Sequence, residues 1–333
     1  MSKPGTFVIS LDFELYWGVR DKTTIDEYKD NLLGVRQAVP ALLDLFQEYQ
    51  IHATWSVVGF LFARTKEELF RAIPLKKPRY VNPYLSPYHT LHEIGMNEQE
   101  DPFHFAPSLI EKILSYPNQT IGTHTFSHYY CLEKGQNMET FRDDLLSAIQ
   151  IASTYNVRLE SLVFPRNQFN GEYLSICEEL GIKCYRGNPS SWIYRANNQE
   201  DPSLLKRLAR FCDAYINISG HNCHSFEKIK SAYPFDIPAS RFLRPYWSRL
   251  DMFESLRLKR IQSDLTYAAK NGLVYHLWWH PYNFGVNLEK NLSFLKKILA
   301  HYGKLRMEYG MNSLNMEQIA DRLLEENRNK QAG

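Results

Sequence analysis

The sequence lacks the features that mark several protein classes. Its five cysteines are odd in number and include no C-x-x-C pair, so neither a disulfide framework nor a cysteine zinc site is indicated. No stretch approaches the roughly 20 apolar residues of a membrane-spanning helix. The apolar run that begins at Phe7 is interrupted by Asp12 and is too short for a secretion signal. We therefore expect a soluble, cytoplasmic protein without membrane insertion.

A concentration of charge of one sign is also missing. The chain carries 39 Lys and Arg against 37 Asp and Glu, which gives a formal net charge of +2. Nucleic acids and anionic membranes are recognised by a concentrated basic face, so this balance argues against both as the main partner. With 333 residues, 44% of them hydrophobic, the chain is long enough to bury a large core.

Short apolar or β-branched runs alternate with amphipathic stretches, which is typical of βα units around a parallel sheet. We expect a helix from Asp26, a second from Pro40 and a last one at 315–327. The expected strands are 6–11, 51–58, 120–123, 161–164, 182–185, a short one near 215–218, and 273–279. This series predicts one α/β domain over residues 1–333, a seven-stranded, distorted (β/α) barrel.

Residues 74–106 interrupt this alternation. Prolines recur there among tyrosines and histidines, and the segment is too aromatic for a flexible linker. We predict an ordered insertion over the mouth of the sheet.

Polar side chains follow four of the predicted strands. In a parallel α/β fold, functional residues lie at the carboxyl ends of the strands. Asp12 and Glu14 stand there after the first strand, and an arginine, Arg166, after the fourth. His124 follows the third strand and His280 the last, so carboxylates, imidazoles and an arginine converge on one rim.

Two pairs of histidines stand four positions apart in the sequence. His276 and His280 flank a strand, where four residues span about 13 Å, so they do not share an ion. We assign His276 to the core, satisfied by a hydrogen bond. His124 and His128 lie in a strand-to-helix loop, where residues four apart are close enough to share a metal.

The carboxylates Asp12 and Glu14 point to the same side if the chain stays extended between them. One of the two can complete a site of two histidines and one carboxylate, and the other can act as a base. A catalytic divalent ion such as zinc takes three protein ligands and keeps a position for water. Taken singly, a carboxylate at a strand end is more often a cap or an ion-pair partner, so the shared rim carries the interpretation.

These segments together resemble the polysaccharide deacetylase family, carbohydrate esterase family four, from Phe7 to about Gly285. The stretch His124-Thr125-Phe126-Ser127-His128 is similar to the family's H-[ST]-x-x-H metal motif. Ile9-Ser10-Leu11-Asp12-Phe13-Glu14 is similar to its first motif, but most members have two adjacent aspartates there. The displaced glutamate resembles a D-x-E sub-branch of the family.

The resemblance implies a role for each matched residue. Asp12 would be the general base that activates the attacking water. Glu14, His124 and His128 would hold one divalent metal ion, with zinc as the first choice and cobalt, nickel, manganese or iron as alternatives.

Three further positions follow from the same resemblance. Arg166, in the segment that takes the place of the third motif, would orient the base. His280 occupies the final motif, whose histidine protonates the leaving amine. Trp192 offers the tryptophan of the fourth motif, although no aspartate accompanies it.

The family implies a metal-dependent hydrolase that removes an N-acyl group, first of all N-acetyl, from a sugar. Without a secretion signal, we expect an intracellular N-acylated carbohydrate, for instance an intermediate of surface-polysaccharide biosynthesis. We expect Trp192 and Arg244 to contact this substrate, Arg244 through a phosphate or carboxylate. Allantoinase-like or deformylase chemistry on another C–N bond is an alternative, and so is a non-catalytic glycan-binding barrel.

Overall fold

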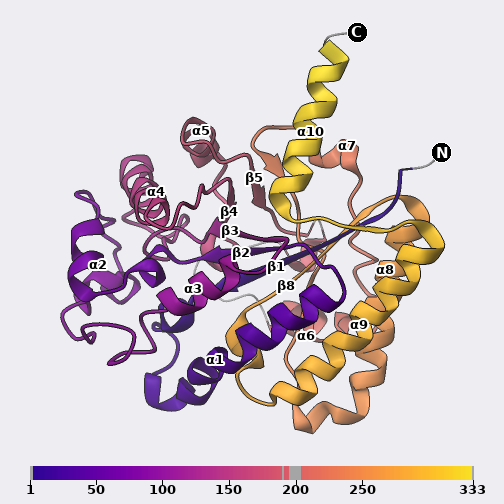
Figure 1. The fold of residues 1–333 in the computed structure, drawn as a ribbon, viewed down its shortest axis with the longest axis horizontal. Coiled ribbons are helices and arrows are strands. Elements are labelled where there is room, and N and C mark those ends of the chain that lie inside the picture. The colour runs from indigo at the N-terminus through magenta and orange to yellow at the C-terminus, as the bar shows by residue number, and fades with distance from the viewer. Residues whose placement is uncertain (1–2, 190, 195–203, 332–333) are drawn as a thin grey trace.

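The computed structural model describes residues 3–189, 191–194 and 204–331. At its centre is a parallel sheet that helices surround (Figure 1). The order of its strands is β6-β5-β4-β3-β2-β1-β8-β7, and the short β9 also pairs with β1. The strands are β1 Thr6–Phe13, β2 Ala53–Val57, β3 Gln119–Thr123, β4 Ser161–Val163, β5 Cys184–Arg186, β6 Phe235–Asp236, β7 Arg241–Phe242, β8 Val274–Trp279 and β9 Asn312–Ser313.

One extended segment, residues 235–243, joins the two edges of this sheet. The amides of Ile237 and Ala239 donate to carbonyls of and just after β5, while those of Ser240 and Leu243 donate to carbonyls of β8. The edge strands β6 and β7 therefore belong to one stretch of chain that curls the sheet round. β1 to β5, this segment and β8 surround the interior, which confirms the predicted distorted (β/α) barrel.

Helices follow most strands and cover the outside of the sheet, with α1, α8 and α9 along one flank (Figure 1). Where the structure describes the chain, no helix combines the length and hydropathy needed to cross a bilayer. The helices are α1 Ile25–Glu48, α2 Lys66–Ala72, α3 Pro107–Leu114, α4 Met138–Ser153, α5 Leu174–Glu179, α6 Leu204–Asp213, α7 Phe226–Ile229, α8 Glu254–Asn271, α9 Leu288–Tyr309 and α10 Met316–Gln331.

The expectation of two helices between 26 and 48 is wrong, because α1 runs without interruption through Pro40. A proline inside a helix removes one backbone hydrogen bond, but its fixed φ suits the helix. Burial of Leu42, Leu43 and Phe46 beyond the proline offsets that loss. The helix begins at Ile25 and its N-cap is Thr24, two positions before Asp26: the Thr24 hydroxyl accepts from the amide of Glu27, and the Glu27 carboxylate accepts from the amide of Thr24.

The expectation of a strand near 215–218 is also wrong. Ile216 and Ile218 are 64% and 52% exposed and pair with no strand. The amides of Ile218 and Ser219 instead donate to the buried Asp213 carboxylate at the end of α6, which turns the chain there.

The segment 74–106 contains no strand and forms two short 3-10 turns, Pro83–Leu85 and Pro87–His89. Arg20, in the loop after β1, donates to the carbonyls of Tyr84 and Leu85. At another point the Tyr80 hydroxyl accepts from the amide of Tyr130 at 2.9 Å. The insertion is thus fastened to two of the loops at the carboxyl ends of the strands.

The opposite end of the barrel is closed by α10. Its Glu317 accepts hydrogen bonds from Thr54 of β2 at 2.9 Å, from Thr120 of β3 at 2.8 Å and from Ser161 of β4. One carboxylate thereby satisfies hydroxyls from three neighbouring strands inside the barrel.

Candidate metal centre and active site

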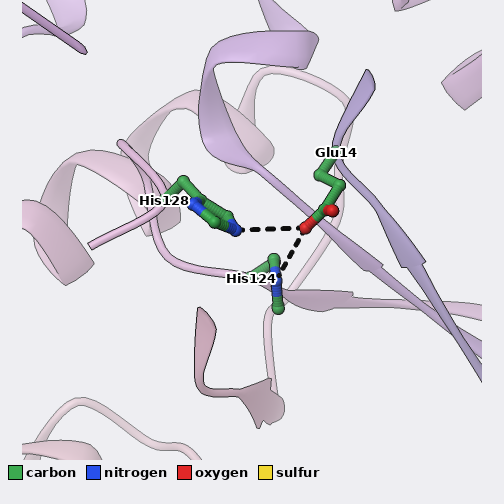
Figure 2. A group of neighbouring side chains, drawn as sticks. All are labelled: Glu14, His124 and His128. Carbon is green, nitrogen blue, oxygen red and sulfur yellow. Dashed lines mark hydrogen bonds and ion pairs between the residues drawn. The ribbon is translucent and has the colours of Figure 1, made fainter. Parts of the chain in front are cut away.

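Glu14, His124 and His128 come together at the carboxyl ends of the strands (Figure 2). Glu14 follows β1 directly, and His124 follows β3. Oε2 of Glu14 lies 3.1 Å from Nε2 of His124 and 3.1 Å from Nε2 of His128. All three side chains are buried, and their potential ligand atoms lie within 4.8 Å of one another.

The loop that carries both histidines is held in an unusual conformation. The backbone φ angles of His128 and Thr125 are +57° and +63°, in the left-handed region that residues other than glycine seldom adopt. Asp144 of α4 stabilises the loop, because its carboxylate accepts from the amides of Phe126 and Ser127 and from the Ser127 hydroxyl. Strain of this kind persists where surrounding contacts enforce it, and it is concentrated at functional sites.

The protonation states of these groups suit a metal. Burial lowers the pKa of His128 to about 4, so its imidazole stays neutral. Burial opposes ionisation of Glu14, but the neighbouring His280, His124 and His128 hold its pKa well below the usual value. An ionised carboxylate together with imidazole nitrogens is a donor set that zinc and similar divalent ions bind. These residues therefore fit the metal that the sequence predicts.

Two tyrosines support the ligand residues from outside. The Tyr282 hydroxyl donates to Oε1 of Glu14 at 2.7 Å. The Tyr130 hydroxyl lies 3.2 Å from Nδ1 of His128 and 3.5 Å from Oδ1 of Asp21. Such partners orient metal ligands and tune their basicity.

The second carboxylate, Asp12, is 3% exposed and forms a two-pronged ion pair with Arg186, the last residue of β5. Its Oδ1 and Oδ2 lie 2.7 Å from Nη1 and Nη2 of Arg186. Burial acts to raise the pKa of Asp12, but the charge and hydrogen bonds of Arg186, together with the neighbouring His124 and His280, hold the pKa below its usual value. Asp12 is therefore ionised beside the three-ligand group.

The expectation that Arg166 orients Asp12 is not met by the structure. The backbone turns through Arg166 with φ of +56°, which directs its guanidinium to Asp21 and over the Tyr130 ring, 4.4 Å from the ring centroid. Arg186, which holds Asp12 instead, is not among the residues predicted from the sequence. A signal for Arg186 was present in the sequence, because a charged residue at the end of a short buried strand needs a buried partner of opposite charge.

His280 lies beside both carboxylates. Its Nε2 is 3.4 Å from Oε1 of Glu14 and 3.8 Å from Oδ2 of Asp12. The ring stacks on Tyr282 with centroids 4.8 Å apart, and the edges of Phe242 and Trp278 complete its surroundings. Burial lowers the pKa of His280.

The two predicted substrate contacts fare differently. The side chain of Trp192 lies outside the described residues. Arg244 is half-buried, follows β7, and places its guanidinium over Phe211, 5.6 Å from the ring centroid. The nearby Arg241 is buried and pairs with Asp213 of α6 and Asp264 of α8.

A cavity opens beside the loop after β1, and none of Asp12, Glu14, His124, His128 and His280 lines it. It has a volume of about 1280 Å³ and lies between residues 16–27 and 83–104. Its wall includes Asp21, which the Tyr130 hydroxyl links to His128. Aromatic rings of Tyr16, Tyr84 and Phe103 also line it.

Comparison with solved structures confirms the fold. A putative polysaccharide deacetylase from Mycobacterium smegmatis is 14% identical with a TM-score of 0.62, and covers 98% of this chain and 92% of its own. A probable polysaccharide deacetylase from Pseudomonas aeruginosa PAO1 is 12% identical, with a TM-score of 0.54 and coverages of 95% and 89%. An allantoinase is 11% identical, with a TM-score of 0.53 and the same coverages.

A search among curated proteins found no match. The sequence model of the polysaccharide deacetylase family matches residues 23–185. The matched region contains His124 and His128, while Asp12 and Glu14 precede it and Arg186 and His280 follow it. This match confirms the resemblance seen in the sequence: residues 23–185 match the model of the polysaccharide deacetylase family.

Proposed function

We propose that this protein is a metal-dependent hydrolase that removes an N-acyl group, first of all N-acetyl, from a sugar or glycan intermediate. The match to the polysaccharide deacetylase family model supports hydrolysis of an acetylated carbohydrate. The observation that carries the finer proposal is the arrangement of Asp12, held by Arg186, and His280 on the rim that bears the three-ligand group.

Glu14, His124 and His128 are the proposed metal ligands. A divalent ion held by them, with zinc as the first choice, supplies a Lewis acid that polarises the acyl carbonyl and lowers the pKa of water. The ionised carboxylate of Glu14 and the neutral imidazole of His128 are already in the forms that bind such an ion.

Asp12 is the proposed base. Its ionised carboxylate accepts a proton from the attacking water as the oxygen adds to the acyl carbon. Arg186 holds both carboxylate oxygens, so the orientation of Asp12 is set before the substrate arrives.

His280 is the proposed acid. Burial lowers its pKa, but the charges of Glu14 and Asp12 oppose that effect and favour the imidazolium, which donates a proton to the amine nitrogen as the C–N bond breaks. The products are a free carboxylic acid and an amino sugar. The stacked Tyr282 ring restricts rotation of the His280 imidazole.

The residues at the mouth of the barrel support a sugar as the substrate. We propose that residues 1–333 act as one domain, in which 74–106 covers the cavity and Tyr84, 80% exposed, stacks on a sugar ring. Arg244 and Trp192 remain proposed substrate contacts. We place the reaction inside the cell, on an intermediate of surface-polysaccharide assembly.

The test combines metal analysis with a substrate panel. Purified wild-type protein is analysed by inductively coupled plasma mass spectrometry alongside His128→Ala and a control, His52→Ala. His52 is half-buried and contacts Gln318 of α10 instead of the ligand group. We expect about one divalent ion per chain in wild type and control and its loss in His128→Ala. No metal in any of them contradicts the proposal.

The substrate panel contains N-acetyl sugars, N-formyl sugars and small ureides. Release of acetate from N-acetyl sugars supports deacetylation. Turnover of formyl sugars or ureides alone assigns the site to a deformylase or to allantoinase-like chemistry. Glycan binding without turnover by the metal-loaded protein supports the non-catalytic alternative.

A further inference from the structure

Ser10 and His276 lie below Asp12 in the barrel interior, and neither has a role in the chemistry above. Both are fully buried, Ser10 on β1 and His276 on the neighbouring β8. We propose that they are positioning residues, which fix the Arg186 guanidinium and thereby the orientation of Asp12. The catalytic meaning of this inference rests on the proposed function, while its structural meaning does not.

A backbone carbonyl determines which atoms donate in the chain of hydrogen bonds from His276 to Arg186. Nδ1 of His276 lies 3.1 Å from the carbonyl oxygen of Ile237, which only accepts, so Nδ1 carries a proton. Burial lowers the pKa of His276 to about 3, and the ring is neutral. Nε2 is therefore an acceptor, and the Ser10 hydroxyl, 2.8 Å away, donates to it.

This leaves Ser10 able only to accept from its other side. Nη1 of Arg186 lies 3.0 Å from the Ser10 oxygen and fills that position. His276 thus fixes the hydroxyl rotor, and the hydroxyl presents a lone pair to the arginine. A freely rotating hydroxyl would lose part of this bond through rotational entropy.

Arg186 is fixed from several directions. Nη1 donates to Ser10 and to Asp12, and Nη2 donates to Asp12 and, at 3.1 Å, to Oδ1 of Asn167. The guanidinium also lies over the Trp278 ring, 4.1 Å from its centroid. A planar guanidinium held through both terminal nitrogens and one face has a single orientation. The two parallel hydrogen bonds to Asp12 then fix the orientation of its carboxylate.

The backbone sets the position of His276 as well. Its amide donates to the Ser240 hydroxyl at 2.9 Å, and its carbonyl accepts from the Ser240 amide. Ile237 and Ser240 belong to the segment 235–243 that closes the barrel. The orientation of the base is therefore connected to the closure of the sheet.

The test compares two serines that lose the same atom. Ser10→Ala removes the hydroxyl between His276 and Arg186. Ser161→Ala removes a buried hydroxyl at the other end of the barrel, where it donates to Glu317. We expect kcat for deacetylation to fall about 10-fold in Ser10→Ala with KM within about twofold of wild type. We expect the two variants to lower the melting temperature by similar amounts, and Ser161→Ala to leave kcat unchanged.

Crystal structures of the wild type and of Ser10→Ala give a readout that needs no activity. We expect the Arg186 guanidinium to rotate away from its two-pronged contact with Asp12. If the wild type hydrolyses no member of the panel, the proposed function fails, and this structural comparison still decides the positioning role.

A second pair of variants covers the case in which Ser10→Ala does not fold. His276→Gln keeps an acceptor near the Nε2 position and retains most of kcat, while His276→Leu removes the acceptor and loses it. Equal kcat values for Ser10→Ala and Ser161→Ala, or an unchanged Arg186 in the Ser10→Ala crystal, would overturn the inference. So would equal kcat values for the two His276 variants.

Discussion

The hydroxyl of Tyr282 donates to one oxygen of Glu14, Oε1, at 2.7 Å, while the other oxygen faces His124 and His128 at 3.1 Å. The two oxygens of one carboxylate are thus divided between a neighbouring phenol and the proposed metal. The same phenol ring stacks on His280. Tyr282 therefore connects the proposed metal ligand with the proposed acid.

Tyr282→Phe keeps the stacked ring and removes only the hydroxyl. We expect metal affinity to fall about 10-fold to 100-fold, because Glu14 loses the bond that orients it. Competition with a chromogenic chelator measures the change. Tyr155→Phe is the control, since its hydroxyl donates to the Phe62 carbonyl away from the site. Equal affinities for the two variants would contradict this role of Tyr282.

Arg186→Lys and Arg166→Lys separate the observed partner of Asp12 from the one expected from sequence. A lysine cannot reproduce the two-pronged contact with Asp12. We expect kcat to fall about 100-fold or more in Arg186→Lys, and clearly less in Arg166→Lys, whose guanidinium pairs with Asp21. Steady-state kinetics on the same N-acetyl substrate checks this order, and the reverse order would return the orienting role to Arg166.

Arg20→Ala removes one of the contacts that join residues 83–104 to the loop after β1, the one at Tyr84 and Leu85. Without the bonds to the Tyr84 and Leu85 carbonyls, we expect faster amide hydrogen exchange across this segment and a higher KM with a smaller effect on kcat. Arg71→Ala is the control, because Arg71 is exposed and pairs only with Glu67 among the contacts described. Unchanged exchange would show that the insertion is held by other contacts.

Acid should destabilise the protein through His224. Burial lowers its pKa to about 4, whereas an unfolded histidine titrates near 6.5. Between these values the unfolded chain binds more protons, so the free energy of unfolding falls as the pH drops from about 6.5 to 4. We expect His224→Gln to show a smaller drop than wild type in urea titrations at pH 7.5, 6 and 5. Exposed His92→Gln should keep the wild-type slope.

Much of the fold follows from local patterns in the sequence. Strands such as β1, β2 and β8 are runs of mostly buried residues. His124 and His128 stand four positions apart in a loop, and that spacing brings two side chains close together. These features need no knowledge of distant parts of the chain. They are the reason that the barrel and the group of Glu14, His124 and His128 were predictable.

Other features depend on contacts that local patterns do not contain. The segment 235–243 contains Pro238 and reads as a loop, but it is extended because β5 and β8 supply its hydrogen-bond partners. Arg186 resembles any basic residue at a strand end until the barrel places it opposite Asp12. The helix through Pro40 likewise depends on burial that the proline itself does not reveal.

Glu317 links the order of synthesis to the order of folding. The hydroxyls of Thr54, Thr120 and Ser161 lie in strands made early, yet the carboxylate that satisfies them belongs to α10, which follows every strand of the sheet along the chain. While the chain is still emerging from the ribosome, this end of the barrel has its hydroxyls but not their acceptor. The interior is therefore completed only after residue 317 has left the exit tunnel, and the amino end of the barrel stays open until then.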